Sequence, residues 1–236
     1  MATIAPGTLT VTSAYPDPPF EVTQDGADSG FDAELMEAVC HHLGLRREPM
    51  RFEGDDFNHI FDGLAEKTCD AVISGTTITP ERQRVALFSK PYLESGQSLV
   101  VNCVRTPQIR SVDDLGGQVV GIQVGNTSDV VARDLKAKGK LADIRYYPYG
   151  GILDALDDLE AGKIGGFMKL LPVTTWLVRD RPDLAVVQEI PTHERLGVAF
   201  ALDNTALCSA VNDALDALKA EGTLAELEKK WLRSTR

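Results

Sequence analysis

Residues 73–82, with the sequence Ile-Ser-Gly-Thr-Thr-Ile-Thr-Pro-Glu-Arg, combine groups that bind carboxylates. Arg82 supplies a guanidinium, which can donate two parallel hydrogen bonds to one carboxylate. Gly75 offers an exposed backbone N–H, and Thr76 and Thr77 offer short hydroxyl donors. The segment has no nucleophile next to a base, which covalent catalysis requires. It therefore predicts the binding of a small carboxylate rather than chemistry on it.

The composition limits the classes of partner. The chain has 236 residues, 43% hydrophobic and 25% charged, which is ordinary for a soluble globular protein. Its net charge of −11 argues against nucleic acid and against an anionic membrane surface, although a local pocket can still bind an anion. No apolar run approaches the ~20 residues of a membrane span. The start of the chain lacks the pattern of a secretory signal, so we expect either a cytosolic protein or an exported one whose signal was removed.

Four cysteines are present, and no two of them form a Cys-x-x-Cys pair: Cys40, Cys69, Cys103 and Cys208. This spacing does not indicate a zinc ribbon or a thioredoxin-like motif. Buried free thiols and a disulfide both stay open, and Cys40 with Cys69 is the first pair to test. No metal site, phosphate-binding loop or other cofactor motif is predicted.

Apolar periodicity alternates between that of strands and that of helices. Expected strands cover residues 8–12, 70–74, 98–101, 118–124, 144–147, 166–170, 184–187 and 197–201. Expected helices cover residues 32–43, 57–64, 129–138, 153–159, 207–218 and 223–231, with a further helix opened by Pro172. Residues 125–128 read as a turn and helix N-cap. The alternation predicts an α/β fold with mainly parallel sheets.

In a series of short sequence motifs the chain resembles the type II periplasmic solute-binding proteins for polar amino acids (bacterial extracellular solute-binding protein family 3). These proteins are the partners of ABC importers. The resemblance covers nearly the whole chain in family order. It is carried by residues 7–11, 19–20, 30–32, 70–73, 77–82, 88–92, 114–117, 120–125, 159–162, 197–199 and 222–223, with Trp231.

This resemblance implies two Rossmann-like α/β lobes joined by a two-strand hinge. Lobe one would hold residues 1–102 and 197–236, and lobe two residues 103–196. The ligand would lie in the cleft between the lobes, which would close around it by a hinge motion. The resemblance also implies a periplasmic or surface-anchored monomer that serves the membrane permease of an ABC importer.

The resemblance also assigns ligand contacts. In the family, the arginine at the position of Arg82 pairs with the ligand α-carboxylate, and donors at the positions of Gly75 and Thr77 support it. The helix N-terminus at Asn126-Thr127 is expected to donate N–H groups to the same carboxylate. Phe57 matches a ring wall of the family's pocket.

One position departs from the family pattern. The family usually has an acid at the position of Leu170, where it pairs with the ligand ammonium, and a leucine cannot neutralise that charge. Either Asp17 supplies the missing charge, from a position three residues before Phe20, or the ligand has no α-ammonium. Lys169 should point to the opposite face of its strand from Leu170.

We therefore predict a solute-binding protein, not an enzyme, for an amino acid or an amino-acid-like carboxylate. Two alternatives remain. The same fold occurs in enzymes that resemble cyclohexadienyl dehydratase, and in this chain Asp17 would be the candidate acid or base for such catalysis. The domain also occurs as the ligand-sensing module of receptors.

Overall fold

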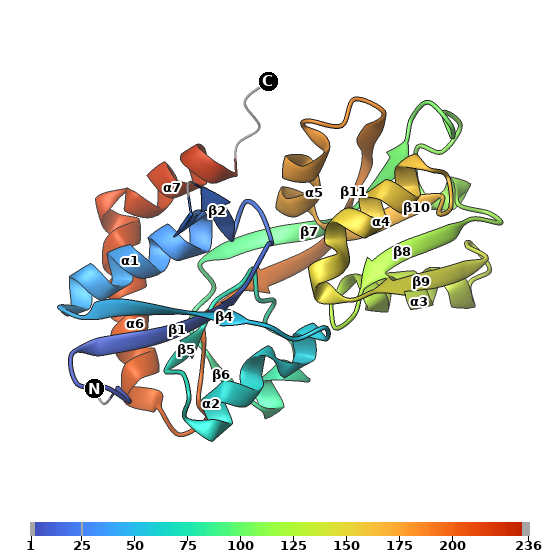
Figure 1. Ribbon diagram of the computed structural model, residues 1–236. Helices are drawn as coiled ribbons and strands as arrows, with labels where there is room; N and C mark the ends of the chain where they lie inside the picture. Colours follow the sequence, from blue (N-terminus) through green and yellow to red (C-terminus); the bar gives the residue numbers. More distant parts are fainter. Residues whose placement is uncertain (1–2, 25, 233–236) are drawn as a thin grey trace. The chain divides into compact units, whose positions relative to one another are not determined.

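The structure is a computed structural model, and it describes residues 3–24 and 26–232. The chain forms two compact units, and Figure 1 labels most of their helices and strands. The first contains the residues up to Glu53, His59–Glu94 and the residues from Arg195 onward; the second contains Gly54–Asn58 and Ser95–Glu194. Residues 95–102 lie in the second unit, whereas the sequence places them in lobe one. Within this segment, residues 97–100 pair as a strand with residues 167–170 of the second unit.

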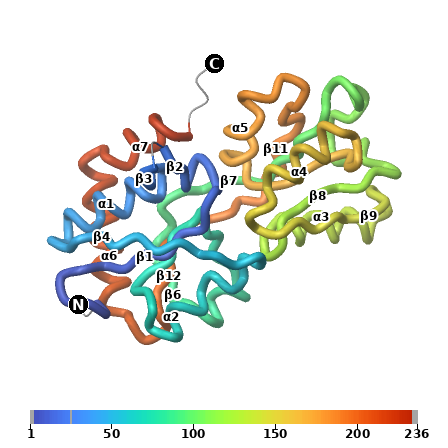
Figure 2. The backbone as a smooth tube through the Cα atoms, in the orientation of Figure 1, coloured from blue at the N-terminus to red at the C-terminus, as the bar shows by residue number. Residues whose placement is uncertain are grey.

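The first unit is built on a five-stranded sheet in the order β4-β1-β5-β12-β6. Its strands are β1 (Thr8–Ala14), β4 (Arg46–Phe52), β5 (Ala71–Val72), β6 (Leu87–Phe88) and β12 (Ala199–Phe200). β1 runs parallel to β4 and β5, and β12 runs antiparallel to β5 and β6. β1 and β4 can be followed side by side in Figure 2. A separate ribbon pairs β2 (Val22–Gln24) with β3 (Ala27–Ser29).

Three helices of the first unit contact one another: α1 (Phe31–Leu43), α6 (Thr205–Glu221) and α7 (Thr223–Trp231). α1 buries Leu35, Met36 and Val39 completely and ends at Gly44, which adopts the left-handed conformation that favours glycine. The expected helix over residues 57–64 is split into a 3-10 turn, η1 (Phe57–Phe61), and the short α2 (Asp62–Glu66). A second 3-10 turn, η2, covers Arg82–Arg84.

The second unit is built on a sheet in the order β11-β7-β10-β8-β9. Its strands are β7 (Leu93–Asn102), β8 (Val119–Gln123), β9 (Asp143–Tyr147), β10 (Gly166–Leu170) and β11 (Leu184–Leu196). Its helices are α3 (Ser128–Ala137), α4 (Ile152–Glu160) and α5 (Leu171–Val178), with short turns η3 (Val112–Asp114) and η4 (Tyr149–Gly151). β8, β9 and β10 are parallel, so their carboxyl ends meet at one edge of the sheet. Ligands of open α/β sheets bind outside such an edge.

The predicted α/β class is confirmed, and both sheets are mixed rather than purely parallel. The sequence missed β4, because Pro49 and four charged residues interrupt its apolar alternation. The chain passes between the two units within β7 and within β11, the two long strands, and also at both ends of the short segment Gly54–Asn58.

All four cysteines have free thiols; Cys40, Cys69 and Cys208 are buried and Cys103 is exposed. A Cys40–Cys69 disulfide is therefore absent from this structure. Among residues 3–24 and 26–232, no helix combines the length and the apolar character needed to cross a membrane.

Candidate functional site

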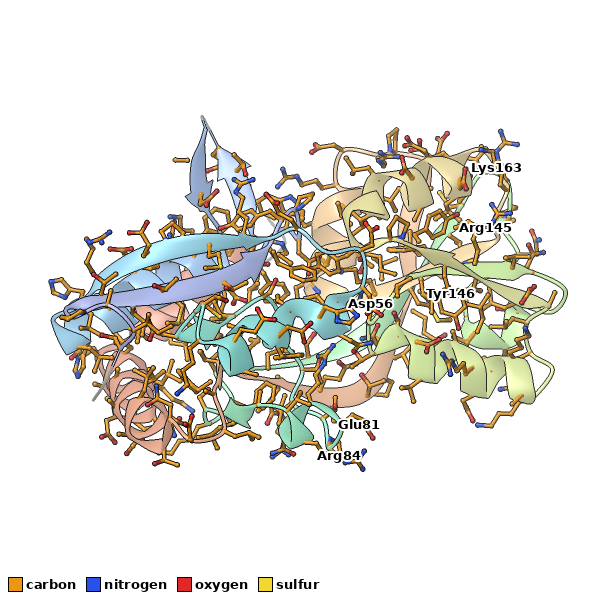
Figure 3. All side chains as sticks on the ribbon, turned by 60° about the horizontal axis from the view of Figure 1, so that its bottom comes forward. Asp56, Glu81, Arg84, Arg145, Tyr146 and Lys163 are labelled. Atoms are coloured by element: carbon orange, nitrogen blue, oxygen red, sulfur yellow. The ribbon has the colours of Figure 1, made fainter. Side chains whose placement is uncertain are left out.

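Arg82 is buried at the start of η2, with 7% of its surface exposed. Its neighbours Glu81 and Arg84 are exposed at the surface (Figure 3). The Nη1 of Arg82 donates to the carbonyl oxygen of Thr77 at 3.0 Å, and its guanidinium carbon lies 5.8 Å from the centre of the Phe61 ring. The guanidinium is therefore held against the loop that follows β5, rather than solvated at the surface.

That loop, residues 74–77, is buried throughout. The N–H of Gly75 donates to the Oδ2 of Asp32 at 2.7 Å, so a carboxylate of the protein already uses this donor. Gly75 has φ of +52°, and a Cβ at this position would lie 3.0 Å from the Phe20 ring. The glycine thus sets the shape of the loop. The hydroxyl of Thr76 is fully buried and has no hydrogen-bond partner within the described part of the chain.

Asp17 lies in a cluster of three buried carboxyl groups, with Glu21 and Asp32. Asp17 and Glu21 exchange backbone hydrogen bonds of 3.2 and 3.0 Å, and Asp32 also accepts from the Tyr92 hydroxyl at 3.0 Å. Burial raises the pKa of Glu21 well above its usual value, and the charges of Asp32 and Asp17 raise it further. Burial also raises the pKa of Asp32, to about 7, although hydrogen bonds from Gly75 and Tyr92 oppose the shift. We infer that the cluster holds at least one proton at neutral pH.

In the second unit, Thr127 is the N-cap residue of α3, but its hydroxyl makes no capping bond to its own helix. It donates instead to the Oε2 of Glu194 at 2.7 Å and accepts from the Nε2 of Gln97 at 3.1 Å. The first N–H groups of a helix have no partner within the helix. Beside them, the Ser128 hydroxyl and the Nδ2 of Asn126 are buried with no hydrogen-bond partner among the described residues. This first turn can accept an anion.

Phe57 lies against the same turn. Its N–H donates to Val124 at 3.3 Å, and its ring stacks on Tyr149 with centres 5.0 Å apart. The ammonium of Lys169 lies 5.0 Å from the Tyr149 ring centre and donates to Gln123 at 2.5 Å. Leu170, the last residue of β10, is 6% exposed.

The structure thus groups the predicted residues by unit. Asp17, Gly75, Thr76, Thr77 and Arg82 belong to the first unit, and Phe57, Asn126, Thr127 and Leu170 to the second. Sequence reasoning did not assign a role to the carboxyls of Glu21, Asp32 and Glu194 or to the amide of Gln97. Asp32 lies within residues 30–32, which carry part of the family resemblance. Its hydrogen bond with Gly75, however, joins residues that are 43 positions apart in the sequence. Gln97 and Glu194 are 97 residues apart, and no local pattern connects them.

Comparison with known proteins identifies the family. The profile of bacterial extracellular solute-binding proteins, family 3, matches residues 9–234. The chain belongs to this family. A curated family relative, the putative ABC transporter arginine-binding protein 2 of Escherichia coli K12, is 32% identical over 223 residues, which cover 92% of this chain and 87% of the relative.

Solved structures of similar proteins agree with this assignment. An ancestral arginine-binding protein bound to arginine has a TM-score of 0.87 at 30% identity, covering 96% of this chain and 99% of that one. An ancestral amino acid-binding protein described as a precursor of cyclohexadienyl dehydratase has a TM-score of 0.86 at 30% identity, covering 96% of each chain. The predicted type II periplasmic-binding-protein fold is therefore confirmed.

Proposed function

We propose that this solute-binding protein captures an amino acid, or a closely similar compound, through its carboxylate group and delivers it to an ABC importer. The observation that carries the proposal is Arg82: a buried guanidinium held against a loop of hydroxyl donors. A buried cation of this kind is suited to a planar, bidentate anion. The names of the relatives, which refer to amino-acid binding, support the same ligand class.

The mechanism we propose has two steps. The carboxylate first binds Arg82, with Thr76 and Thr77 as the neighbouring hydroxyls. The first turn of α3 then contributes the N–H group of Thr127 and the side-chain amide of Asn126 to the same ligand, because the backbone N–H of Asn126 already donates to the carbonyl oxygen of Gln123 at 3.3 Å. Binding shifts the population of the protein toward the liganded conformation, which a membrane permease recognises. The protein acts as a monomer in the periplasm or at the cell surface.

A thermal-shift screen tests this function. The panel contains the twenty standard amino acids, cystine, and 2-hydroxy acids with matching side chains. A ligand present at 100 times its Kd stabilises the folded state by about 2.7 kcal/mol, because it binds only that state. We expect at least one amino acid to raise the melting temperature by several degrees. If no compound shifts it at millimolar concentration, the proposal fails.

The similarity to a dehydratase precursor justifies testing one alternative, an enzyme that acts on prephenate or arogenate. The buried Asp17 would have to serve as its acid or base. Incubating the protein with each compound and measuring the aromatic product decides the matter. We expect no product above the rate of a buffer blank; turnover that disappears in Asp17→Asn would establish the enzyme instead.

A further inference from the structure

Hydrogen-bond acceptors meet around the Thr127 hydroxyl in the second unit. The Oε1 of Glu194 accepts from the Nε2 of Gln97 at 2.7 Å and from the Thr192 hydroxyl at 3.0 Å. Its Oε2 accepts from Thr127 at 2.7 Å. Glu194 is 8% exposed and Gln97 is 1% exposed, so the cluster is largely shielded from water. We call Gln97, Thr127 and Glu194 the acceptor triad.

The orientation of the Gln97 amide follows from its partner. A carboxylate can only accept, so the Nε2 of Gln97 must face Glu194. Its Oε1 then points elsewhere, and within residues 3–24 and 26–232 this buried atom has no donor. A buried acceptor without a donor costs free energy. The Thr127 hydroxyl gives its proton to Glu194 and accepts one bond from Gln97, which leaves it one further lone pair. Both atoms can therefore receive an N–H group.

The triad also lies next to Leu170, the position at which the family usually has an acid. Gln97 is the cross-strand partner of Leu170 in the antiparallel pairing of β7 with β10. Directly opposed residues project from the same face of a sheet, with Cβ atoms about 5 Å apart. Leu170 brings no charge to this face, whereas Glu194 brings one carboxylate, a single hydrogen bond away from both Gln97 and Thr127.

We propose that the acceptor triad binds the α-ammonium of the ligand, in place of the acid that Leu170 cannot supply. The ammonium donates to the Oε1 of Gln97 and to the Oγ1 of Thr127, and the Glu194 carboxylate neutralises its charge through Thr127. The ligand carboxylate binds the adjacent first turn of α3. Because the two groups of an α-amino acid are joined through one carbon atom, neighbouring sites for a cation and an anion fit a zwitterion. This inference rests on the proposed amino-acid function and narrows the ligand class to α-amino acids.

Replacing Glu194 with glutamine tests the proposal with two matched ligands, the best amino acid of the screen and its 2-hydroxy acid. The variant keeps the shape of the side chain and removes its charge. We expect the Kd of the amino acid to rise about tenfold, because an interaction with a charged group is lost. The hydroxy acid should bind equally well or more tightly, since a negative charge near its carboxylate is gone. Glu189→Gln, at an exposed position of the same strand, is the control and should change neither Kd.

The outcomes separate the explanations. An equal loss for both ligands means that Glu194 is only structural, and an unchanged amino-acid Kd overturns the proposal. A selective loss in Asp17→Asn, but not in Glu194→Gln, assigns the ammonium to Asp17 instead. If Glu194→Gln does not fold, Gln97→Met removes the amide and should produce the same selective loss. A wild-type protein that binds neither ligand refutes the proposed function itself.

Discussion

Replacing Arg82 with alanine is expected to raise the Kd of the carboxylate ligand at least 100-fold. A hydrogen bond to a charged group contributes about 1.5–3 kcal/mol, and truncating one member of a buried charge pair costs about 2–5 kcal/mol. Arg82 is 7% exposed, and its guanidinium is held in place by the Thr77 carbonyl and the Phe61 ring, so truncation to alanine removes a buried, positioned charge. Calorimetric titration of the wild type and the variant measures the loss.

Two further variants show whether the loss belongs to the guanidinium. Arg82→Lys keeps the charge but not the planar fork, so we expect an intermediate loss of affinity. Arg84→Ala removes an exposed arginine two residues away and should leave the Kd unchanged (Figure 3). The melting temperature of each variant confirms that it is folded. A folded Arg82→Ala protein with wild-type affinity would remove Arg82 from the site.

The second large effect is a loss of stability as the pH rises from about 4 to about 7. The pKa of Asp32 is raised from its usual 3.8 to about 7 in the folded protein, and that of Glu21 is raised well above its usual value. Below the pKa that the carboxyl group has in the unfolded protein, both the folded and the unfolded state hold the proton, and the free energy of unfolding does not change with pH. Above it only the folded state holds the proton, so the free energy of unfolding falls until the folded pKa is reached. For Asp32 alone this difference corresponds to about 4 kcal/mol.

Glu21→Gln isolates this effect. Glutamine resembles a permanently protonated glutamic acid and can donate to Asp32, so it should stabilise the protein at pH 8 and flatten the dependence on pH. Urea unfolding between pH 4 and pH 8 provides the measurement, with the exposed Glu66→Gln as the control. A glutamine variant that is less stable than the wild type at pH 8 would contradict a protonated cluster. Below pH 4 the carboxyls whose pKa is lowered, Glu81, Asp114, Asp143 and Asp158, change stability in the opposite direction.

The sequence was most informative where function depends on adjacent residues. The segment ending at Arg82 combines a strand, a glycine turn and hydroxyl donors within ten residues, and the turn residues at 125–128 correctly predict that a helix begins after Asn126-Thr127. Helix α1 follows equally well from its apolar spacing and from Gly44. In each case the physical cause lies within about ten residues of the residue concerned.

The sequence was least informative where a side chain depends on distant partners. Gly75 was expected to offer a free N–H, but Asp32, 43 residues away, accepts its hydrogen bond. Thr127 was expected to cap a helix or hold a carboxylate, yet its hydroxyl donates to Glu194, 67 residues away. These pairings depend on strand order and on which side chains exclude water. Neither property has a local signature.

The most direct test of a carboxylate-anchored amino-acid site compares the best amino acid of the screen with the amine that lacks its carboxylate. Both are titrated calorimetrically into the wild-type protein under identical conditions. Our account predicts one site per chain, with the amine binding at least 100-fold more weakly because Arg82 has lost its partner. Equal affinities for the two compounds would contradict it.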